Sequence, residues 1–131
     1  MSQITAHIKK ELYKVELVST TGNILIADEP LAMGGKDLGF SPKELLASAL
    51  AACTSATLRM YADRKGWDLE EVKLEVTLER DQKENKTIIK RTLEFIGNLD
   101  AAQKNRLLAI ANACPVHKML TNPIEIHTQV V

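Results

Sequence analysis

The sequence predicts an α+β fold in which antiparallel β-hairpins pack around one long, buried central helix. Stretches of alternating apolar and polar residues occur in pairs joined by polar turns, which indicates hairpins. One apolar and small-residue segment, residues 42–65, follows a strong helix start and is too long for a strand. With 131 residues, 45% of them hydrophobic, the chain can bury one core, so we expect a single domain over residues 1–131.

The first elements are predicted to be strands. Residues 3–18 indicate mainly one strand, with a bulge near residues 9–11, where the phase of the alternation shifts. A Thr-Thr-Gly-Asn turn then predicts a hairpin into a second strand over residues 23–27. Residues 28–40 contain a proline and three glycines without periodicity. We expect a loop there that is long enough to be functional or to cross to a partner subunit.

The sequence Ser-Pro-Lys-Glu at residues 41–44 is a strong helix start. A serine N-cap, a proline at the first helical position and Glu44 at the third satisfy unpaired backbone groups. The helix is expected to run to Lys65 and to end at Gly66, which gives about 24 residues and about 36 Å. Its first half, LLASALAAC, is apolar or small on every face and is expected to be buried. The second half turns polar and is expected to reach solvent.

The next segment predicts a second hairpin and a second helix. Residues 72–78 show the sharpest apolar–polar alternation in the chain, and residues 87–96 are expected to pair with them across a polar turn. Asn98 or Asp100 then caps a helix over residues 101–113.

Two short elements are expected at the end. Pro115 interrupts the helical run, after which residues 116–120 can form one more turn. The alternating residues 124–130 predict a final strand. This order of elements is typical of hairpins covered by helices rather than of βαβ crossovers.

Composition excludes several classes of function. Seventeen basic and seventeen acidic residues cancel, so the chain lacks the positive field that nucleic-acid or anionic-membrane binding needs. The longest apolar stretch, residues 45–53, is too short to cross a bilayer. No apolar segment follows the first charged residues, so we expect no secretory signal and a cytoplasmic protein. Two cysteines there act as thiols rather than as a disulfide framework.

The two cysteines differ in their surroundings. Cys53 lies in the most apolar segment, where a buried thiol is usually a small hydrophobic residue. Cys114 precedes Pro115 and can act as the N-cap of the short turn, so backbone amides and the helix dipole would lower its pKa. His117 and Lys118 follow within reach. By spacing alone, Cys114 is the more readily activated thiol.

Other chemistry is less well supported. A metal site at Cys114 and His117, with Cys53 as a third ligand, is a minor alternative because such half-sites are frequent by chance. The capping role alone accounts for a glutamate at position 44, so a catalytic role for Glu44 is the second interpretation. The other two histidines are expected to be surface residues. An aromatic content of 4% and the lack of a glycine-rich phosphate loop argue against nucleotide or RNA binding.

Two segments together resemble a known family. SPKELLASALAACT, around Cys53, and ANACPVHKMLTNPIEI, around Cys114, are similar to the two cysteine signatures of the OsmC/Ohr family, the osmotically inducible protein C and organic hydroperoxide resistance proteins. The elements between them match in order, so the resemblance spans most of the chain. It implies an OsmC-like domain that forms an intertwined homodimer with a pocket at the interface.

The resemblance also implies a reaction. In peroxide-reducing members, the cysteine that matches Cys53 attacks the peroxide and the one that matches Cys114 resolves the intermediate as a disulfide. The implied substrate is a small organic hydroperoxide, and the implied reductant is a cellular dithiol, for which the resemblance suggests the lipoyl type. No metal and no bound cofactor are required.

The substrate pocket is expected to be apolar. Leu45, Leu46, Leu50 and Met60 would line it, together with His117, and an apolar wall gains about 25 cal/mol per Å² of covered ligand. Such a pocket suits a fatty or aromatic hydroperoxide. The alternative is a non-catalytic OsmC-like protein whose interfacial pocket binds a small apolar or thiol-containing molecule.

One activating group is missing from its usual place. Peroxide-reducing relatives carry an arginine in the N-terminal strand-loop region and an acid directly after the helix-start proline. Here the first arginine is Arg59, and Lys43 occupies the position of the acid, with Glu44 one place later. A buried cysteine without a cationic neighbour has a raised pKa, so another cation must activate the thiolate. The candidates are Lys36, Lys43, Lys118 and His117.

Overall fold

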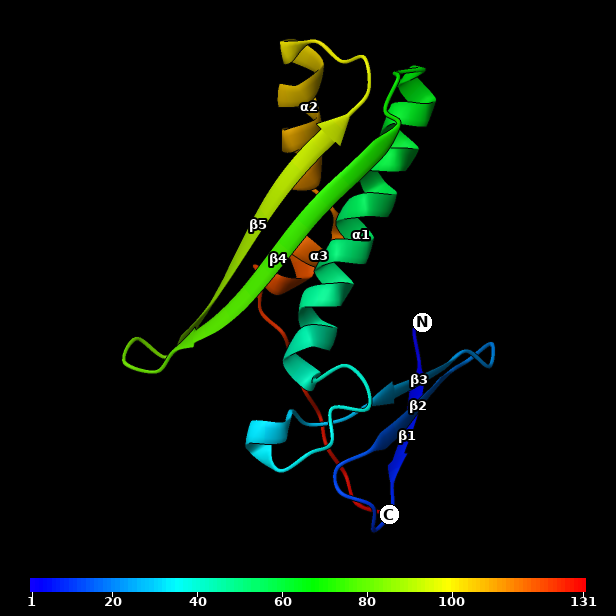
Figure 1. Ribbon diagram of the computed structural model, residues 1–131, viewed down its shortest axis with the longest axis vertical. Helices are drawn as coiled ribbons and strands as arrows, with labels where there is room; N and C mark the ends of the chain where they lie inside the picture. The colour runs from blue at the N-terminus through cyan, green and yellow to red at the C-terminus, as the bar shows by residue number, and fades with distance from the viewer. The chain divides into compact units, whose positions relative to one another are not determined.

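A computed structural model describes residues 1–131. The chain forms two compact units, Met1–Leu46 and Ala47–Val131, and one continuous helix, α1 (Pro42–Lys65), runs from the first into the second (Figure 1). The α+β class is confirmed: the strands pair antiparallel, and a central helix packs against them. A single domain over residues 1–131 stays a prediction.

The first unit contains a three-stranded antiparallel sheet. Its strands are β1 (Ile4–Ile8), β2 (Val15–Ser19) and β3 (Ile24–Ala27), in the order β1-β2-β3. The expectation of one bulged strand over residues 3–18 was wrong, because residues 9–14 reverse the chain and the two halves pair with each other. The shift in the apolar–polar alternation near residues 9–11 therefore marks a turn between two strands rather than a bulge within one. The hairpin into β3 is confirmed.

One buried carboxylate organises the loop that follows β3. Asp28 is 2% exposed and accepts hydrogen bonds of 2.8–3.2 Å from four backbone amides, those of Leu38, Glu29, Tyr13 and Lys36. Burial raises the pKa of Asp28, but the four amides outweigh it and hold the pKa below its usual value. The buried carboxylate of Asp28 therefore fixes the backbone of this loop through hydrogen bonds.

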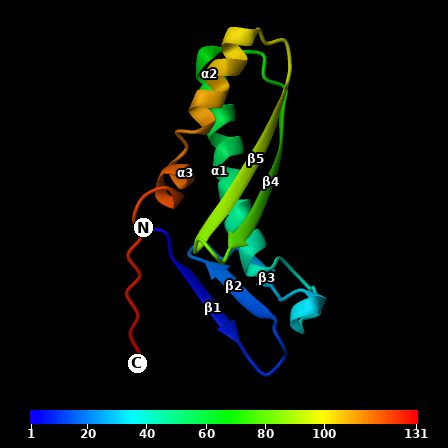
Figure 2. The same cartoon turned by 90° about the vertical axis from the view of Figure 1, so that its left-hand side faces the viewer.

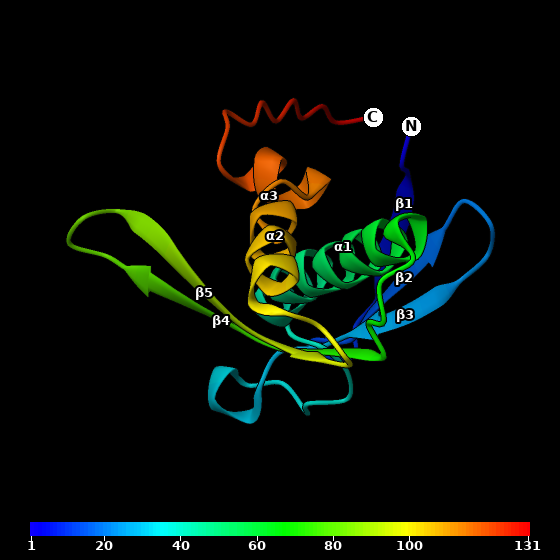
Figure 3. The same ribbon diagram turned by 90° about the horizontal axis from the view of Figure 1, so that it is seen from above.

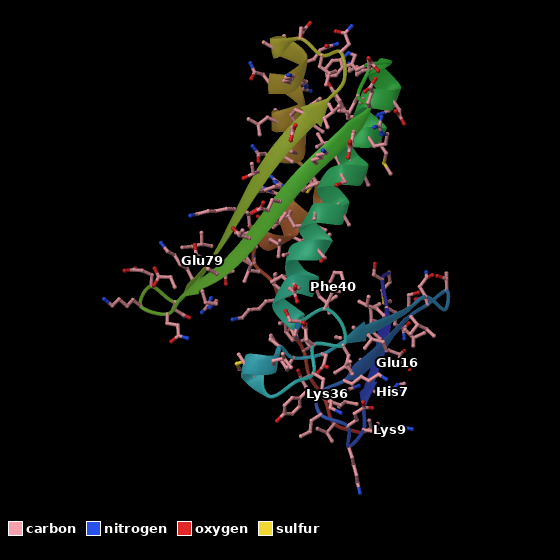
Figure 4. All side chains as sticks on the ribbon, in the orientation of Figure 1. His7, Lys9, Glu16, Lys36, Phe40 and Glu79 are labelled. Carbon is pink, nitrogen blue, oxygen red and sulfur yellow. The ribbon has the colours of Figure 1, made fainter.

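One exposed pair of polar side chains joins β1 to β2. Figure 4 labels His7, Lys9 and Glu16 on this part of the chain. His7 Nε2 lies 3.9 Å from Glu16 Oε1, and both side chains are exposed, so the pair contributes little to stability. The expectation that His7 is a surface residue is confirmed.

The helix α1 begins and ends as the sequence predicts. The Ser41 amide donates to Glu44 Oε1 (2.9 Å) and the Glu44 amide donates to Ser41 Oγ (3.2 Å), which completes a capping box. Gly66 follows the last helical residue with φ of 68°, the left-handed conformation that glycine adopts without strain.

Only one face of α1 is buried. Its buried residues recur every fourth position and form a single stripe: Leu50, Thr54, Leu58 and Ala62. The expectation that the first half is buried on every face was wrong, since Ala49 and Ala52 are exposed. The polar end of the helix, residues 59–65, reaches solvent as expected, since Met60, Asp63, Arg64 and Lys65 are exposed and only Ala62 is buried there. By length and composition alone, α1 could cross a membrane, but in this structure its buried stripe packs into a protein core.

The second unit is a long hairpin with helices on one side. Strands β4 (Glu71–Asp81) and β5 (Lys86–Ile96) pair antiparallel along their whole length, as predicted. Figures 2 and 3 show α1 and α2 (Ala101–Ala111) on the same side of this hairpin. Between them lies the core, formed by Leu58, Ala62, Leu69, Leu107 and Ala111. Of the two predicted caps, Asp100 is the N-cap of α2, and it forms a capping box with Gln103.

The chain ends differently from the prediction. A short helix, α3 (Pro115–Leu120), forms as expected after the interruption at Cys114. The final strand over residues 124–130 was wrong: residues 123–131 have no regular structure and are exposed. A strand needs a neighbour for its backbone hydrogen bonds, and this segment pairs with none in its own chain.

Candidate functional site

The fold brings the two cysteines together in the second unit. Cys53 lies in the middle of α1 and Cys114 at the start of α3, and both are free thiols. The two sulfurs are close enough for the Cys53 side chain to lower the pKa of Cys114. Cys114 is fully buried, whereas Cys53 is partly exposed. Of the two residues, Cys53 is therefore the more accessible to solvent.

The first turn of α3 serves both sulfurs. The His117 amide donates to Cys114 Sγ at 3.4 Å, which confirms Cys114 as the N-cap. The Val116 amide donates to Cys53 Sγ at 3.5 Å. Pro115 has no N–H, so the first two amide hydrogens of the helix go to one sulfur each. The contact with the His117 amide favours the Cys114 thiolate over the thiol.

Thr54 joins the thiols to a charged group. Its Oγ1 lies 2.7 Å from the Leu50 carbonyl oxygen, 3.8 Å from Cys114 Sγ and 2.9 Å from Arg91 Nη1. A hydroxyl has one hydrogen and two lone pairs, and the guanidinium can only donate. The single hydrogen of Thr54 therefore serves either the carbonyl or the sulfur, while the oxygen accepts from Arg91.

Arg91 on β5 is the cation of this site. Besides Thr54, its Nη2 donates to Asn112 Oδ1 (2.9 Å) and contacts His117 Nδ1 (3.2 Å). Because arginine stays protonated, Nδ1 of His117 must accept, which leaves the ring hydrogen on Nε2. The three ion pairs of the chain lie elsewhere, so Arg91 has no carboxylate partner.

These contacts set the acidity of Cys114. Burial raises the pKa of its thiol, but hydrogen bonds from the His117 amide, the Thr54 hydroxyl and the Cys53 side chain lower it, as does the positive charge of Arg91. The net result is a pKa below the ordinary value for cysteine. Cys114 is therefore stabilised as a thiolate although no water reaches it.

Arg91 is not among the activating cations predicted from the sequence. Those candidates, Lys36, Lys43, Lys118 and His117, lie near Cys114 in sequence or in the first part of the chain. The strand pattern could have indicated Arg91. Residues 89, 91, 93 and 95 share one face of β5, and the three residues other than Arg91 are Ile, Leu and Phe. A lone arginine at an inward register position of an otherwise apolar face indicates a functional or paired charge.

A cavity of about 410 Å³ opens beside Arg91 in the second unit. Its wall combines aliphatic side chains with a small polar group: Leu50, Ile89, Leu93, Leu108 and Leu120, with Thr87, Arg91, Asn112, His117 and Thr121. Two of the residues expected to line the substrate pocket, Leu50 and His117, lie in this wall. Met60 is 63% exposed and does not line it.

Four of the remaining candidates, Glu44, Leu46, Lys36 and Lys43, belong to the first unit. The contacts of Glu44 there are those of the capping box, and hydrogen bonds from Ser41 lower its pKa. Lys118 is exposed. Nowhere do three or more His, Cys, Asp or Glu side chains gather as metal ligands, so the minor metal alternative finds no third ligand in this chain.

Comparison with known proteins identifies the family. A model of the OsmC-like protein family matches residues 34–129, including both cysteines. The chain belongs to the OsmC-like protein family. A search of curated proteins gives no match.

Solved structures share the fold of this OsmC-like protein. A Psychrobacter arcticus structure, titled as an osmotic stress induced and detoxification response protein, is 25% identical, with a TM-score of 0.79 over 91% of this chain and 88% of that one. A Legionella pneumophila organic hydroperoxide resistance protein is 24% identical, with a TM-score of 0.68 over 92% and 89%. The organic hydroperoxide resistance protein OhrB of Bacillus subtilis is also 24% identical, with a TM-score of 0.64 over 92% and 90%.

Proposed function

We propose that this OsmC-like protein is a cytoplasmic thiol peroxidase that reduces organic hydroperoxides. The observation that carries the proposal is the pair of neighbouring free thiols on the first turn of α3, of which one is partly exposed and the other has a lowered pKa. Structural relatives named as organic hydroperoxide resistance proteins support the same activity. Cys53 is the attacking thiol because it alone is partly exposed, and Cys114 is the resolving thiol.

The proposed reaction uses two electrons from the two thiols. The Cys53 thiolate attacks the terminal peroxide oxygen, the O–O bond breaks, and the alkoxide takes a proton to leave as an alcohol. The Cys114 thiolate then attacks the sulfur of the Cys53 sulfenic acid, and hydroxide leaves as water after protonation. A cellular dithiol, of the lipoyl type implied by the family, reopens the resulting disulfide by exchange and is itself oxidised.

The attacking thiolate forms at the more accessible of the two cysteines. The partly exposed Cys53 loses its proton to solvent. The Val116 amide stabilises the Cys53 thiolate that forms. Arg91 supports the negative charge of the pair through Thr54, in the role that an N-terminal arginine has in peroxide-reducing relatives.

The proposal includes a homodimer. A stripe of apolar and small side chains, Ala49, Ala52, Ala56 and Met60, is exposed along α1 in the single chain. Burial of such a stripe against a second copy would restore the all-round burial that the helix composition predicts. This support is independent of the thiols.

Peroxide titration of the reduced protein tests the activity. One equivalent of cumene hydroperoxide is added without oxygen, thiols are counted, and the disulfide is located by mass spectrometry. We expect both thiols to be lost at once and one intramolecular Cys53–Cys114 disulfide to form. Inert thiols would contradict the peroxidase.

Single variants assign the roles. Cys114→Ser should react once and accumulate a sulfenic acid at Cys53 that dimedone traps, whereas Cys53→Ser should be inert. The reverse pattern would exchange the two roles. Sulfenic acid at neither position would exclude both assignments.

The second candidate function is binding without catalysis. It is favoured by the cavity beside Arg91, whose wall contains neither cysteine. In that case a small apolar or thiol-containing ligand would bind while the thiols stay unreactive in the same titration.

A further inference from the structure

The wall of the cavity beside Arg91 combines a polar cluster with aliphatic side chains. Arg91 contacts both Asn112 and His117, and all three line the cavity. The rest of the wall is mainly aliphatic, from Leu50, Ile89, Leu93, Leu108 and Leu120. Figure 3 shows α2 and α3, which supply part of this wall, on the same side of the β4–β5 hairpin. The volume of about 410 Å³ lies within the range of small-molecule sites.

The charge of Arg91 is fixed in place but not neutralised. Three neutral acceptors hold its guanidinium, and no carboxylate of the chain lies within ion-pair distance. These acceptors use three of its five N–H groups, which leaves two without a protein acceptor. A half-buried cation in this state attracts an anion more strongly than an exposed one, because less water screens it.

His117 adds a second donor to the same polar cluster. Its Nδ1 accepts from Arg91, so its ring hydrogen lies on Nε2, the nitrogen that the guanidinium does not occupy. His117 itself lines the cavity. The cavity wall contains no acidic residue, and Cys114 is separated from Arg91 by Thr54 and does not belong to the wall.

We propose that this cavity binds a linear aliphatic carboxylate, with the carboxylate on Arg91 and the hydrocarbon chain along the aliphatic wall. The charge and the two unused N–H groups of Arg91 require an anionic oxygen ligand. The aliphatic side chains require a hydrocarbon chain rather than inorganic phosphate or sulfate. This inference concerns binding alone and stands whether or not the thiols reduce peroxides.

Binding of such a ligand has a consequence for the thiols. A carboxylate paired with Arg91 offsets the positive charge that lowers the pKa of Cys114. The bound ligand therefore raises the pKa of Cys114 and reduces the fraction of its thiolate. An aliphatic carboxylate in the cell would then tune the reactivity of the pair.

Calorimetric titration with three matched probes tests the proposal. Octanoate has both charge and chain, octan-1-ol has the chain alone, and acetate has the charge alone. For the full-length reduced protein, we expect octanoate to bind about tenfold more tightly than octan-1-ol, or about 1.4 kcal/mol, and acetate not to bind measurably. Equal affinities for octanoate and octan-1-ol, or binding of neither, would overturn the proposal.

Two arginine variants locate the site. Arg91→Met should reduce the affinity for octanoate to that for octan-1-ol, while Arg106→Met, an exposed arginine on α2 that contacts Tyr61, should leave it unchanged. Arg91→Met with unchanged octanoate affinity would contradict the assignment. Circular dichroism shows whether Arg91→Met folds. If it does not, the thiolate absorbance of the unmutated protein is titrated against pH with each probe. Octanoate should raise the midpoint of this titration, and octan-1-ol should not.

Discussion

Asp28 in the first unit and Cys114 in the second are both buried acids whose pKa lies below its usual value. Their donors differ. Asp28 is held by four backbone amides and by no side chain. Cys114 receives one backbone amide, and its other partners are the side chains of Thr54 and Cys53, with the charge of Arg91 behind them.

This difference separates a structural anion from a chemical one. Backbone amides move only when the chain moves, so the carboxylate of Asp28 fixes a loop and responds to nothing else. Side-chain donors can rotate, exchange a hydrogen or pair with a ligand without unfolding. The acidity of Cys114 can therefore change while the fold stays the same, which a reacting group requires.

The largest effect is expected where all donors are backbone groups. Asp28→Asn replaces one acceptor oxygen by an NH₂ group that faces two buried amides, so those amides lose their partner. We expect the thermal midpoint to fall by about 5–10 °C. Asp37→Asn, in the same loop but exposed, is the control and should leave the midpoint unchanged. A similar midpoint for both variants would show that the buried carboxylate does not hold the loop.

Removal of the arginine charge comes next and should affect reactivity more than folding. Arg91→Met takes away the cation that lowers the pKa of Cys114, so the thiolate fraction falls at neutral pH. We expect disulfide formation after peroxide addition to slow about tenfold, which corresponds to about 1.4 kcal/mol of transition-state stabilisation. Stopped-flow fluorescence or quenched thiol counting measures the rate. Arg91→Lys, which keeps the charge, should recover part of it.

The hydroxyl that connects Arg91 to the sulfur has a smaller effect. Thr54→Val keeps the shape of this fully buried side chain but leaves the hydrogen bonds to Arg91 and Leu50 unmade. We expect a loss of about 1–2 kcal/mol in the free energy of unfolding. The thiolate titration of Cys114 should also move to higher pH. Ser55→Ala, on the next residue of α1, is the matched control, and its thiolate titration should not move.

The smallest expected effects are in the pH dependence of the free energy of unfolding. Asp28 and Cys114 contribute to it in different pH ranges. A group whose pKa is lower in the folded state stabilises the fold above its unfolded pKa, and this stability is lost as pH falls through the folded pKa. For Asp28 the loss occurs below the ordinary value of 3.8, and for Cys114 it occurs below 9.0. Urea unfolding across pH should show the second slope disappear in Cys114→Ser and not in Asp28→Asn.

Local signals accounted for most of what the sequence predicted. Both capping boxes, the β4–β5 hairpin and the N-cap role of Cys114 depend on residues within a few positions of each other. Such features can be predicted from the sequence because the interacting residues are near neighbours in the chain.

The errors concern contacts that the local pattern does not contain. The phase shift near residues 9–14 fits either a bulge or a reversal, and only the pairing of β1 with β2 decides between them. The strand over residues 124–130 has the right alternation but no neighbour in its own chain. Arg91 meets the cysteines only through tertiary packing, although its place on an apolar strand face could have drawn attention to it.

The single hydrogen of Thr54 couples the oxidation state of the sulfur to the backbone of α1. When Cys114 is anionic, that hydrogen is drawn to the sulfur and the Leu50 carbonyl loses a bond; when a disulfide forms, the negative charge disappears and the hydrogen returns. One turn of the central helix thus tightens on oxidation and loosens on reduction. Amide exchange around residue 54 would report the redox state of the protein without any label on the thiols.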